Sequence, residues 1–490
     1  MRVKILLVSL NLSGYHSLAL AFLASYLLSK EMKNHLELKI KNIPLERFEI
    51  FRKHLINFTN DFKPDVIGFS CYAWNFAETV SLCTDLKKIV PNTLVVLGGP
   101  QVSDSEYAHQ ILMKNPDADI IVRNEGEVTF SEIIRNLVEN SQDFSNILGI
   151  TYRKKNEVIA NSEQPPLTNL DEIPSPYLSG VYEKYIANEN TDDLHFFDEK
   201  LAIIETSRGC MFRCAYCLYA RKPGHTTRYF SFERIREDLL YLVTRAKSSN
   251  YILFSDKTMN DDKKRLIQLC DLLAGKEFAN TELFLEIRPE ILDEEVIEHI
   301  GKIRNVRVEL GLQTTNSNSL FLIHRGFNPE KYIKVVNSLQ SRGITTMVDL
   351  ITGLPQDNLL GFKESLGFVL EEARPDSIPV IRLRLYPGTE LYMSKDKYHF
   401  TFEEITFKIM SNDTWTSDDL NKADAIGKTV ENILSRKIFL YKIFALSWPR
   451  EILRKVFKRW SCGNYSINVN DIKILFDEII HFIWSRSWSY

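Results

Sequence analysis

Cysteine is scarce in this 490-residue chain, which contains seven. An odd and thinly spread set of thiols excludes the paired disulfide framework of a small secreted domain. Long apolar runs are also missing, and none reaches the roughly 18 residues of a membrane-spanning helix. The apolar N-terminal stretch is not followed by the small-residue cleavage site of a secretory signal. We therefore expect a cytoplasmic protein whose thiols are reduced.

An excess of charge of either sign is missing as well. The formal net charge is -3, with 26% charged and 44% hydrophobic residues, and the chain has no internal repeat or low-complexity tract. This composition is typical of a folded protein, and it provides no overall field that would attract nucleic acid or an anionic membrane. The length predicts about two to four domains. We expect no nucleic-acid partner, and other partners must be recognised by local sites.

Short β-rich runs alternate with amphipathic stretches over residues 1–145. Strands are predicted at 3–10, 36–43, 64–72, 92–100 and 118–126. Apolar residues recur at helical spacing at 17–28, 47–58, 76–90 and 128–140. Such alternation predicts an α/β fold with a doubly wound parallel sheet and right-handed crossovers.

Ligands bind doubly wound sheets beyond the carboxyl ends of the strands. The residues at or just beyond the carboxyl ends of the predicted strands are therefore candidate ligand contacts: Ser9, Asn11, Tyr15, Ser70, Tyr72, Trp74, Gly98, Gly99, Gln101, Glu125 and Gly126. Glycine at 98 and 99 lets the backbone approach a flat ring closely, because no Cβ atom intervenes.

A second alternating series follows a break. Residues 146–200 contain four prolines and the polar run NENTDD, so we expect a linker there. Beyond it, strands are predicted at 201–205, 251–255, 283–288, 306–311, 345–351 and 378–385. Six strand-helix units are fewer than the eight that close a barrel, so residues 201–392 are predicted to form an open (β/α)6 partial barrel. Residues 393–490 are predicted to be mainly helical.

Three of the cysteines crowd into the segment ETSRGCMFRCAYC, at Cys210, Cys214 and Cys217. They follow the first strand of the second series, on the rim where α/β barrels keep their chemistry. Thiolates are soft ligands that suit zinc, copper(I) or iron-sulfur clusters. A structural zinc requires four ligands, and no second CxxC or suitably spaced histidine lies nearby. Three thiols match a cubane cluster whose fourth iron is left open for a small molecule.

The spacing Cys210-x3-Cys214-x2-Cys217, with an aromatic residue before the last cysteine, resembles the signature loop of radical S-adenosylmethionine enzymes. The later segments FSDKTMNDD, LEIRPE, ELGLQTTN, DLITGLP and LRLYPGTEL resemble those that such enzymes carry at successive strand ends. The resemblance implies a 4Fe-4S cluster on the three cysteines, with S-adenosylmethionine on the open iron and a 5'-deoxyadenosyl radical formed from it.

By the same resemblance, three residues at strand ends would line the S-adenosylmethionine cavity: Glu286, Arg288 and Gln313. Glu286 would hydrogen-bond the ribose or the amino-acid part of that molecule. A carboxylate that faces an ammonium group or a diol is a suitable orienting group.

The first domain also carries a resemblance. GGPQVSDS after one strand and RNEGE after the next are similar to the Rossmann-like cobalamin-binding domain of cobalamin-dependent radical S-adenosylmethionine enzymes. With the barrel, the likeness covers about residues 1 to 392. It implies that the strand-end residues given above contact cobalamin. Tyr72 and Trp74 would pack on the corrin or form core between the domains.

One feature departs from other cobalamin domains. Mutases and methionine synthase supply a histidine from an Asp-x-His-x-x-Gly loop after the first strand, whereas this loop reads SLNLSGYHSLAL. His16 lacks the accompanying Asp and Gly, so we expect it to be a partly exposed loop residue. The lower face of cobalamin would then be unligated by protein or capped by another side chain.

The resemblance implies a methyltransferase that acts on an unactivated carbon. One S-adenosylmethionine would supply the methyl group through cobalamin, and a second would supply the radical. The alternatives are oxidation, ring contraction or cyclisation without methyl transfer, with or without cobalamin, and a cobalamin-binding protein without catalysis. The implied partners are a small-molecule or peptide substrate and an electron donor such as flavodoxin or ferredoxin. The basic stretch 436–460 is expected to close the barrel, with membrane contact as the alternative.

Overall fold

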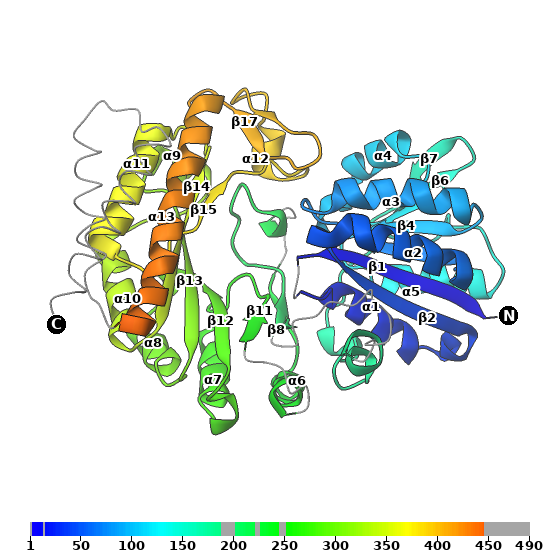
Figure 1. The fold of residues 1–490 in the computed structure, drawn as a ribbon, viewed down its shortest axis with the longest axis horizontal. Helices are drawn as coiled ribbons and strands as arrows, with labels where there is room; N and C mark the ends of the chain where they lie inside the picture. The colour runs from blue at the N-terminus through cyan, green and yellow to red at the C-terminus, as the bar shows by residue number, and fades with distance from the viewer. Residues whose placement is uncertain (1, 13–14, 188–200, 221–225, 245–250, 445–490) are drawn as a thin grey trace.

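The computed structural model describes residues 2–12, 15–187, 201–220, 226–244 and 251–444 (Figure 1). Two α/β domains lie side by side, the N-terminal domain on the right and the barrel on the left of Figure 1. The basic stretch 436–460 lies outside the described residues apart from the helical backbone up to 444, so its role stays a prediction. Among the described residues, no helix has both the length and the apolarity needed to cross a membrane.

The N-terminal domain is built on a seven-stranded sheet in the order β2-β1-β3-β4-β5-β6-β7. Its parallel strands are β1 (Val3–Asn11), β2 (Leu36–Pro44), β3 (Val66–Ser70), β4 (Leu94–Gly98) and β5 (Ile120–Val122). One face packs against α1 (Leu18–Ser29) and α5 (Glu127–Val138). The other packs against α2 (Phe48–Phe62), α3 (Phe76–Ile89) and α4 (Ser105–Lys114). The predicted doubly wound parallel sheet is confirmed.

Burial on both faces explains why the strands could be recognised from the sequence. In β1, Leu7 packs toward α1 and α5, while Leu6 and Val8 pack toward the opposite helices, so the strand is an almost continuous apolar run. Helix α4 was not predicted. It has ten residues and buries only Ala108, Ile111 and Leu112, so its apolar periodicity is short.

The stretch 146–200 differs in part from the predicted linker. Its first part forms β6 (Ile150–Lys154) and β7 (Glu157–Ala160), which add an antiparallel hairpin to the edge at β5. The buried Arg123 at the end of β5 donates hydrogen bonds to the carbonyl oxygens of Ile150 (2.6 Å) and Asn161 (2.6 Å). A buried guanidinium needs such acceptors, so this contact fixes the hairpin on the sheet.

The second domain is an open barrel of six parallel strands in the order β15-β14-β13-β12-β11-β8. These are β8 (Leu201–Ile204), β11 (Tyr251–Phe254), β12 (Glu282–Ile287), β13 (Val306–Gln313), β14 (Thr345–Thr352) and β15 (Val380–Arg382). The helices between them are α6 (Phe232–Thr244), α7 (Lys263–Leu273), α8 (Glu294–Ile300), α9 (Ser317–Leu322), α10 (Pro329–Ser341) and α11 (Leu359–Phe368). The predicted (β/α)6 partial barrel is confirmed.

The region after the barrel is less uniformly helical than predicted. Beyond α12 (Glu390–Met393), a short hairpin is formed by β16 (Thr401–Phe402) and β17 (Ile409–Ser411). The long helix α13 (Ser417–Phe444) then packs against β15, β17 and α11. Gly427 lets the helix approach closely, because a Cβ atom there would lie 2.5 Å from Cβ of Val380.

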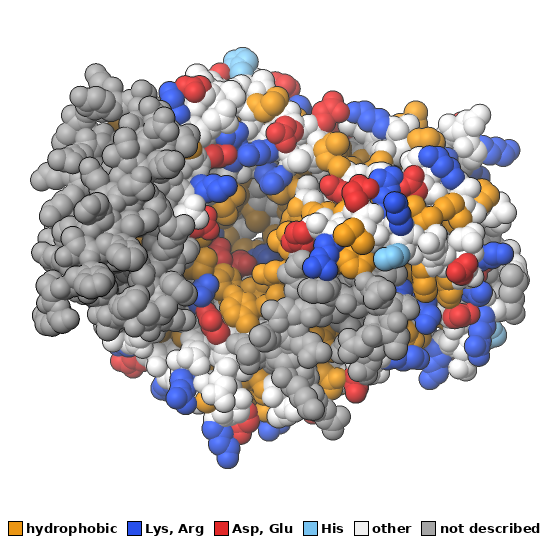
Figure 2. Space-filling model, viewed as in Figure 1, with side chains coloured by type: hydrophobic (Ala, Val, Ile, Leu, Met, Phe, Trp, Pro, Cys, Tyr) orange, Lys and Arg blue, Asp and Glu red, His pale blue; other side chains and the backbone are white. Residues whose placement is uncertain are grey.

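The two domains share apolar contacts. Phe22 of α1 stacks on Phe230 of the barrel domain, with ring centroids 5.9 Å apart and an interplanar angle of 6°. Ala21, Phe22 and Tyr26 are buried in the same hydrophobic cluster as the barrel core. Figure 2 shows that the surface is hollowed where the domains meet, with hydrophobic, acidic and basic side chains in the hollow.

Candidate active site

The three clustered cysteines lie on a loop that leaves the barrel rim after β8. Before the loop, β9 (Ser207–Arg208) pairs antiparallel with β10 (Arg228–Tyr229). Gly209 then turns the chain at a φ of 93°, and a Cβ atom there would lie 2.9 Å from the Thr226 carbonyl oxygen. A residue with a side chain would be strained at this turn, so the glycine directs the loop away from the sheet.

Cationic side chains surround the most buried of these thiols. Nη1 of Arg288 lies 3.3 Å from Sγ of Cys214, and Nη1 of Arg325 lies 3.9 Å from it. The Arg288 guanidinium also lies over the ring of Phe212, 3.7 Å from its centroid. The loop therefore places one buried sulfur beside two cationic groups, which can balance the negative charge of a metal-bound thiolate.

The other two thiols are partly exposed on the same loop. Sγ of Cys210 lies 3.5 Å from Oγ1 of Thr258, at the rim beyond β11. Burial, together with the neighbouring thiols of Cys214 and Cys210, raises the pKa of Cys217 to about 11, although a backbone hydrogen bond from Tyr219 lowers it in part. Such a thiol keeps its proton at neutral pH unless a metal displaces it.

The geometry and number of these thiols fit a cluster better than a single ion. Within the described residues, no three His, Cys, Asp or Glu side chains converge on one metal-ion position. A tetrahedral zinc requires four donors around one point, whereas a cubane binds each thiolate at a separate iron. The three thiols therefore fit a 4Fe-4S cluster.

Glu286 and Lys257 face each other inside the barrel. Glu286, on β12, lies opposite Glu309 of β13, and its Oε1 atom is 3.8 Å from Nζ of Lys257. Burial raises the pKa of Glu286 to about 7, although Lys257 lowers it in part. Burial also opposes the charge on Lys257, but Tyr219 and Glu286 outweigh it and raise the pKa of Lys257. A bound cation would stabilise the ionised form of this buried carboxyl group, which burial disfavours.

The other two predicted S-adenosylmethionine residues have different surroundings. Arg288 is pinned by a reciprocal pair of hydrogen bonds between its backbone and the Asn260 side chain, and its guanidinium contacts Cys214 of the loop. Gln313 ends β13 at a φ of 75°, where the register with β14 shifts. The side-chain amide of Gln313 lies so close to Gly311 that a Cβ atom on Gly311 would be only 2.5 Å from Nε2 of Gln313.

Three residues of this region were missed by sequence reasoning: Lys257, Tyr219 and Arg325. Lys257 lies three residues beyond the end of β11. It could have been found by the rule that selected other residues at strand ends, such as Glu286. Arg325 comes from the segment after α9 and donates to the Gly311 carbonyl oxygen (2.5 Å) and to Glu290 (3.0 Å). Its place beside Cys214 depends on tertiary packing, and no local signal marks it.

The rim of the N-terminal domain contains a small cleft of about 100 Å³ between the sheet and helices α1 and α5. It is lined by Leu7, Ala19, Leu20, Leu23, Gly68, Phe69, Ser70, Val96, Gly98, Gly99, Val122, Asn124, Gly126, Glu127 and Phe130. Four of the predicted contacts, Ser70, Gly98, Gly99 and Gly126, are among them. Its lining is mostly apolar with a few polar groups, which is typical of a ligand pocket.

Two of the glycines in this cleft have different roles. Gly99 has a φ of 108°, and a Cβ atom there would lie 2.6 Å from the Cys71 carbonyl oxygen, so the backbone itself requires glycine. A Cβ atom on Gly98 would meet nothing closer than 3.8 Å, so its missing side chain simply leaves the cleft open. The open space beside Gly98 leaves room for part of a bulky ligand such as cobalamin.

None of the other seven predicted contacts lines this cleft. Ser9 donates to Oδ1 of Asn42 (2.6 Å) and accepts from Asn11 (2.9 Å), so both side chains belong to a buried network at the end of β1. Tyr15 is exposed. Gln101 donates to the Ile405 carbonyl oxygen (2.8 Å) near the β16–β17 hairpin.

Two predicted aromatic contacts lie together at the end of β3. The rings of Tyr72 and Trp74 stack, with centroids 4.4 Å apart and an interplanar angle of 12°. Burial raises the pKa of Tyr72, and Tyr219 of the barrel raises it further while Lys257 lowers it. The aromatic pair of the first domain therefore lies within electrostatic reach of the barrel residues next to the cysteine loop.

Glu125 and His16 have partners other than a ligand. Glu125 forms ion pairs with Arg208 and Arg228 of the barrel domain. His16, expected to be partly exposed, is buried against the edge of Tyr182, with ring centroids 5.1 Å apart. Burial lowers the pKa of His16 to about 4, so the imidazole is neutral, and the residue is not among those that line the cleft.

Binding of the cationic S-adenosylmethionine is expected to strengthen with pH through the titration of Glu286. Its pKa in the folded chain, about 7, lies above the ordinary value of 4.5, so the ionised form that attracts a cation becomes populated only as the pH rises through about 7. The same shift means that stability from the protonated carboxyl is fully present below about 4.5 and is lost as the pH rises through about 7.

Equilibrium binding to the iron-reconstituted chain at about pH 6 and about pH 8 measures this effect. Glu286→Gln is expected to weaken binding about 10-fold at the higher pH and to remove the rise. A pH dependence that persists unchanged in the variant would contradict the role of Glu286.

Comparison with known proteins agrees with this division of the chain. Residues 204–369 match the family model of the radical SAM superfamily, and residues 6–134 match that of the B12 binding domain. The first model covers most of the barrel with its cysteine loop, and the second covers the N-terminal sheet with its cleft. The two models assign S-adenosylmethionine with a 4Fe-4S cluster to the barrel and cobalamin to the N-terminal domain.

Individual relatives carry both parts. The chain is 27% identical over 350 residues to the cobalamin-dependent radical SAM methyltransferase TokK of Streptomyces tokunonensis, covering 67% of this chain and 48% of TokK. It is 25% identical over 381 residues to 2-(S-pantetheinyl)-carbapenam-3-carboxylate methyltransferase of Streptantibioticus cattleyicolor, covering 76% of this chain and 54% of that protein. The chain thus spans about half the length of these relatives.

The fold is also found in a solved structure. OxsB, a cobalamin-dependent S-adenosylmethionine radical enzyme with aqua-cobalamin and S-adenosylmethionine bound, superposes with a TM-score of 0.70 at 15% identity. The match covers 98% of this chain and 75% of OxsB. A three-thiol loop on an open barrel, a cleft on a doubly wound sheet and both family models lead to one conclusion: the chain joins a radical SAM domain to a B12 binding domain.

Proposed function

We propose that the protein methylates an unactivated carbon of a small-molecule or peptide substrate. The observation that carries the proposal is the contact between the two rims, where Glu127, which lines the cleft, forms an ion pair with Arg208, two residues before Cys210. When bound, the cluster with S-adenosylmethionine supplies a 5'-deoxyadenosyl radical, and cobalamin supplies a transferable methyl group. Both reagents must reach the same substrate carbon, so facing rims are required.

The overall reaction balances with the substrate, two molecules of S-adenosylmethionine and an electron donor. The substrate carbon loses a hydrogen atom to the deoxyadenosyl group and gains a methyl group. Two molecules of S-adenosylmethionine are consumed, one released as S-adenosylhomocysteine and the other as 5'-deoxyadenosine and methionine. Two electrons enter from outside, and we propose a protein donor such as flavodoxin or ferredoxin.

The chain's own residues would bind, orient and shield the reactants. Cys210, Cys214 and Cys217 would hold the cluster, and Arg288 with Arg325 would balance thiolate charge at Cys214. Burial of Cys214 limits the access of water to its sulfur, which strengthens the electrostatic contacts with these guanidinium groups. The six cysteines within the described residues are free thiols, and we place the protein in the reducing cytoplasm for that reason.

Stoichiometry of the two nucleoside products tests this function. The reconstituted chain, supplied with cobalamin, reductant and S-adenosylmethionine carrying a deuterated methyl group, is incubated with candidate substrates. Methylation predicts equal amounts of S-adenosylhomocysteine, 5'-deoxyadenosine and a product that carries the label. If 5'-deoxyadenosine forms together with an altered product that carries no label, the reaction is an oxidation or a cyclisation and not a methylation. If the chain binds cobalamin but does not cleave S-adenosylmethionine, only a binding role remains.

A further inference from the structure

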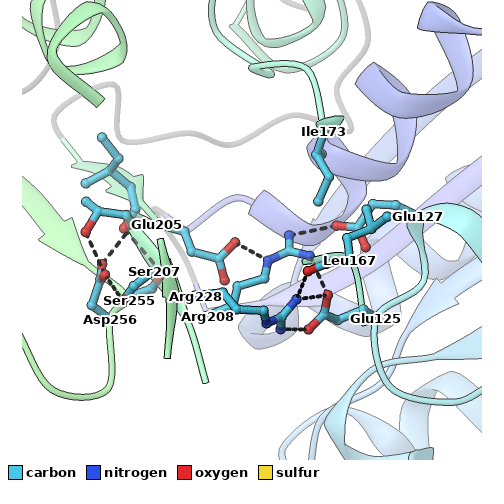
Figure 3. Close-up of polar contacts among 12 residues, drawn as sticks. Glu125, Glu127, Leu167, Ile173, Glu205, Ser207, Arg208, Arg228, Ser255 and Asp256 are labelled. Atoms are coloured by element: carbon cyan, nitrogen blue, oxygen red, sulfur yellow. Dashed lines mark hydrogen bonds and ion pairs between the residues drawn. The ribbon is translucent and has the colours of Figure 1, made fainter. Parts of the chain in front are cut away.

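Five charged side chains join the two domains in a buried group, which we call the interdomain ion cluster: Glu125, Glu127, Glu205, Arg208 and Arg228. Figure 3 shows the guanidinium groups of Arg208 and Arg228 between carboxylates that come from both domains. Glu125 and Glu127 belong to the start of α5 in the first domain, and the other members belong to the barrel domain.

Arg208 is the centre of this group. Its Nη2 atom lies 2.7 Å from Oε1 of Glu127, its Nε atom 2.8 Å from Oε2 of Glu205, and its Nη1 atom 3.5 Å from Oε2 of Glu125. The planar fork of arginine can make these contacts at the same time, which the single ammonium of lysine cannot.

Arg228 ties a third segment into the group. It pairs with both carboxylate oxygens of Glu125 and donates from Nη1 to the carbonyl oxygen of Leu167 (2.5 Å), which lies between the domains in the chain. The first domain, the connecting segment and the barrel therefore meet at two arginines.

The Arg208–Glu127 pair is the most enclosed part of the interdomain ion cluster. The side chains are 10% and 7% exposed, so water screens the interaction little. Burial works against the charge on Glu127, but Arg208 outweighs it and lowers the pKa of Glu127, which keeps the carboxylate ionised. Loss of the charge on one partner would leave the other without its closest counter-ion.

This pair has one end at each cofactor site. Glu127 lines the cleft of the first domain. Arg208 directly precedes Gly209 and Cys210, where the cysteine loop begins, and its backbone is held in the β9–β10 pair. Arg208 also stacks over the ring of Phe22 on α1, 5.1 Å from its centroid. This ion pair therefore links a residue that lines the cleft to the start of the cysteine loop.

We propose that the Arg208–Glu127 ion pair couples occupation of the cleft in the first domain to the position of the cysteine loop, so that each cofactor site strengthens binding at the other. A ligand that fills the cleft removes water from beside Glu127, and the attraction between Glu127 and Arg208 grows as the local dielectric falls. The stronger pair holds Arg208, and with it the start of the loop, in one orientation. Arg208 and Glu127 are thus positioning residues, and this role rests on the proposed function in which both cofactors serve one reaction.

Coupling between two sites is reciprocal, so it can be measured from either side without turnover. Cobalamin affinity is measured by equilibrium titration of the full chain with and without reconstituted iron and sulfide. The parent is expected to bind cobalamin about 5-fold or more tightly when the cluster is present, within the usual range for coupled sites. In the reciprocal measurement, cobalamin is expected to slow the removal of cluster iron by a chelator.

Glu127→Gln is the test variant, because the amide keeps the size and a neutral hydrogen bond to Arg208 but removes the charge. It is expected to reduce the ratio of the two cobalamin affinities to near 1 and to abolish the protection from the chelator. Arg208→Lys keeps the charge but not the fork and is expected to do the same. The matched control is Asp424→Asn, which breaks the ion pair of Asp424 with Arg382 (2.8 Å) inside the barrel domain and is expected to keep the parent's ratio.

The inference is overturned if Glu127→Gln and Arg208→Lys keep the parent's affinity ratio, if the parent itself shows a ratio of 1, or if Asp424→Asn loses the ratio as fully as they do. Failure of the proposed function is a separate result. A chain that loads both cofactors and shows the coupling but forms no methylated product refutes methylation and leaves the coupling in place. A chain that binds no cobalamin refutes both.

Discussion

Replacing Cys214 with alanine is expected to reduce the iron and sulfide content of the anaerobically reconstituted chain to background and to abolish cleavage of S-adenosylmethionine. Cys214 is the most buried of the three thiols and the one that two guanidinium groups contact. Without Cys214, a second iron of the cubane would have no protein ligand, and only two thiolates would hold the cluster. Iron and sulfide analysis, followed by chromatography of 5'-deoxyadenosine, measures both effects.

Cys270 provides the matched control for this experiment. It is also a buried free thiol, but it lies on α7 in the hydrophobic core of the barrel domain. Cys270→Ala removes one small apolar group and is expected to cost about 1 kcal/mol of stability while leaving the iron content unchanged. A Cys214 variant that still assembled a cluster and cleaved S-adenosylmethionine would show that the loop does not bind the metal through this residue.

Replacing Gly98 with leucine is expected to weaken cobalamin binding at least about 100-fold while the chain stays folded and still assembles its cluster. The Cβ atom has room, since its nearest neighbour would lie 3.8 Å away, so the backbone need not move. The rest of the side chain must then project into the cleft that Ser70, Gly99 and Gly126 line, where it takes the place of a ligand. Without cobalamin, methylated product should disappear and 5'-deoxyadenosine should remain.

A size series at the same position separates blocking of the cleft from damage to the fold. Gly98→Ala adds only the Cβ atom, so it is expected to bind cobalamin more weakly than the parent and more tightly than the leucine variant. Cobalamin retained after gel filtration, read from its visible absorbance, measures occupancy, and thermal unfolding of the variants checks the fold. If the leucine variant bound cobalamin as the parent does, the cleft would not be the cofactor site.

The sequence alone was sufficient for features whose residues are neighbours in the chain. The cysteine loop could be recognised because three thiols at fixed local spacing already imply a shared metal centre. The fold class followed from strands such as β1, whose burial on both faces requires an almost continuous apolar run. Gly98 and Gly99 could be selected because parallel strands bring their carboxyl ends to one rim whatever the loops do.

Tertiary structure alone decided which distant residues meet. The hairpin at 150–160 joins the first sheet because the buried Arg123 needs its carbonyl groups, which no local pattern announces. Arg325 reaches Cys214 across 111 positions of the chain, and Glu127 reaches Arg208 across 81. Local spacing of residues determines which helices and strands form. Contacts between these elements depend on how their faces pack, because the side-chain pattern of one segment does not identify the segment that packs against it.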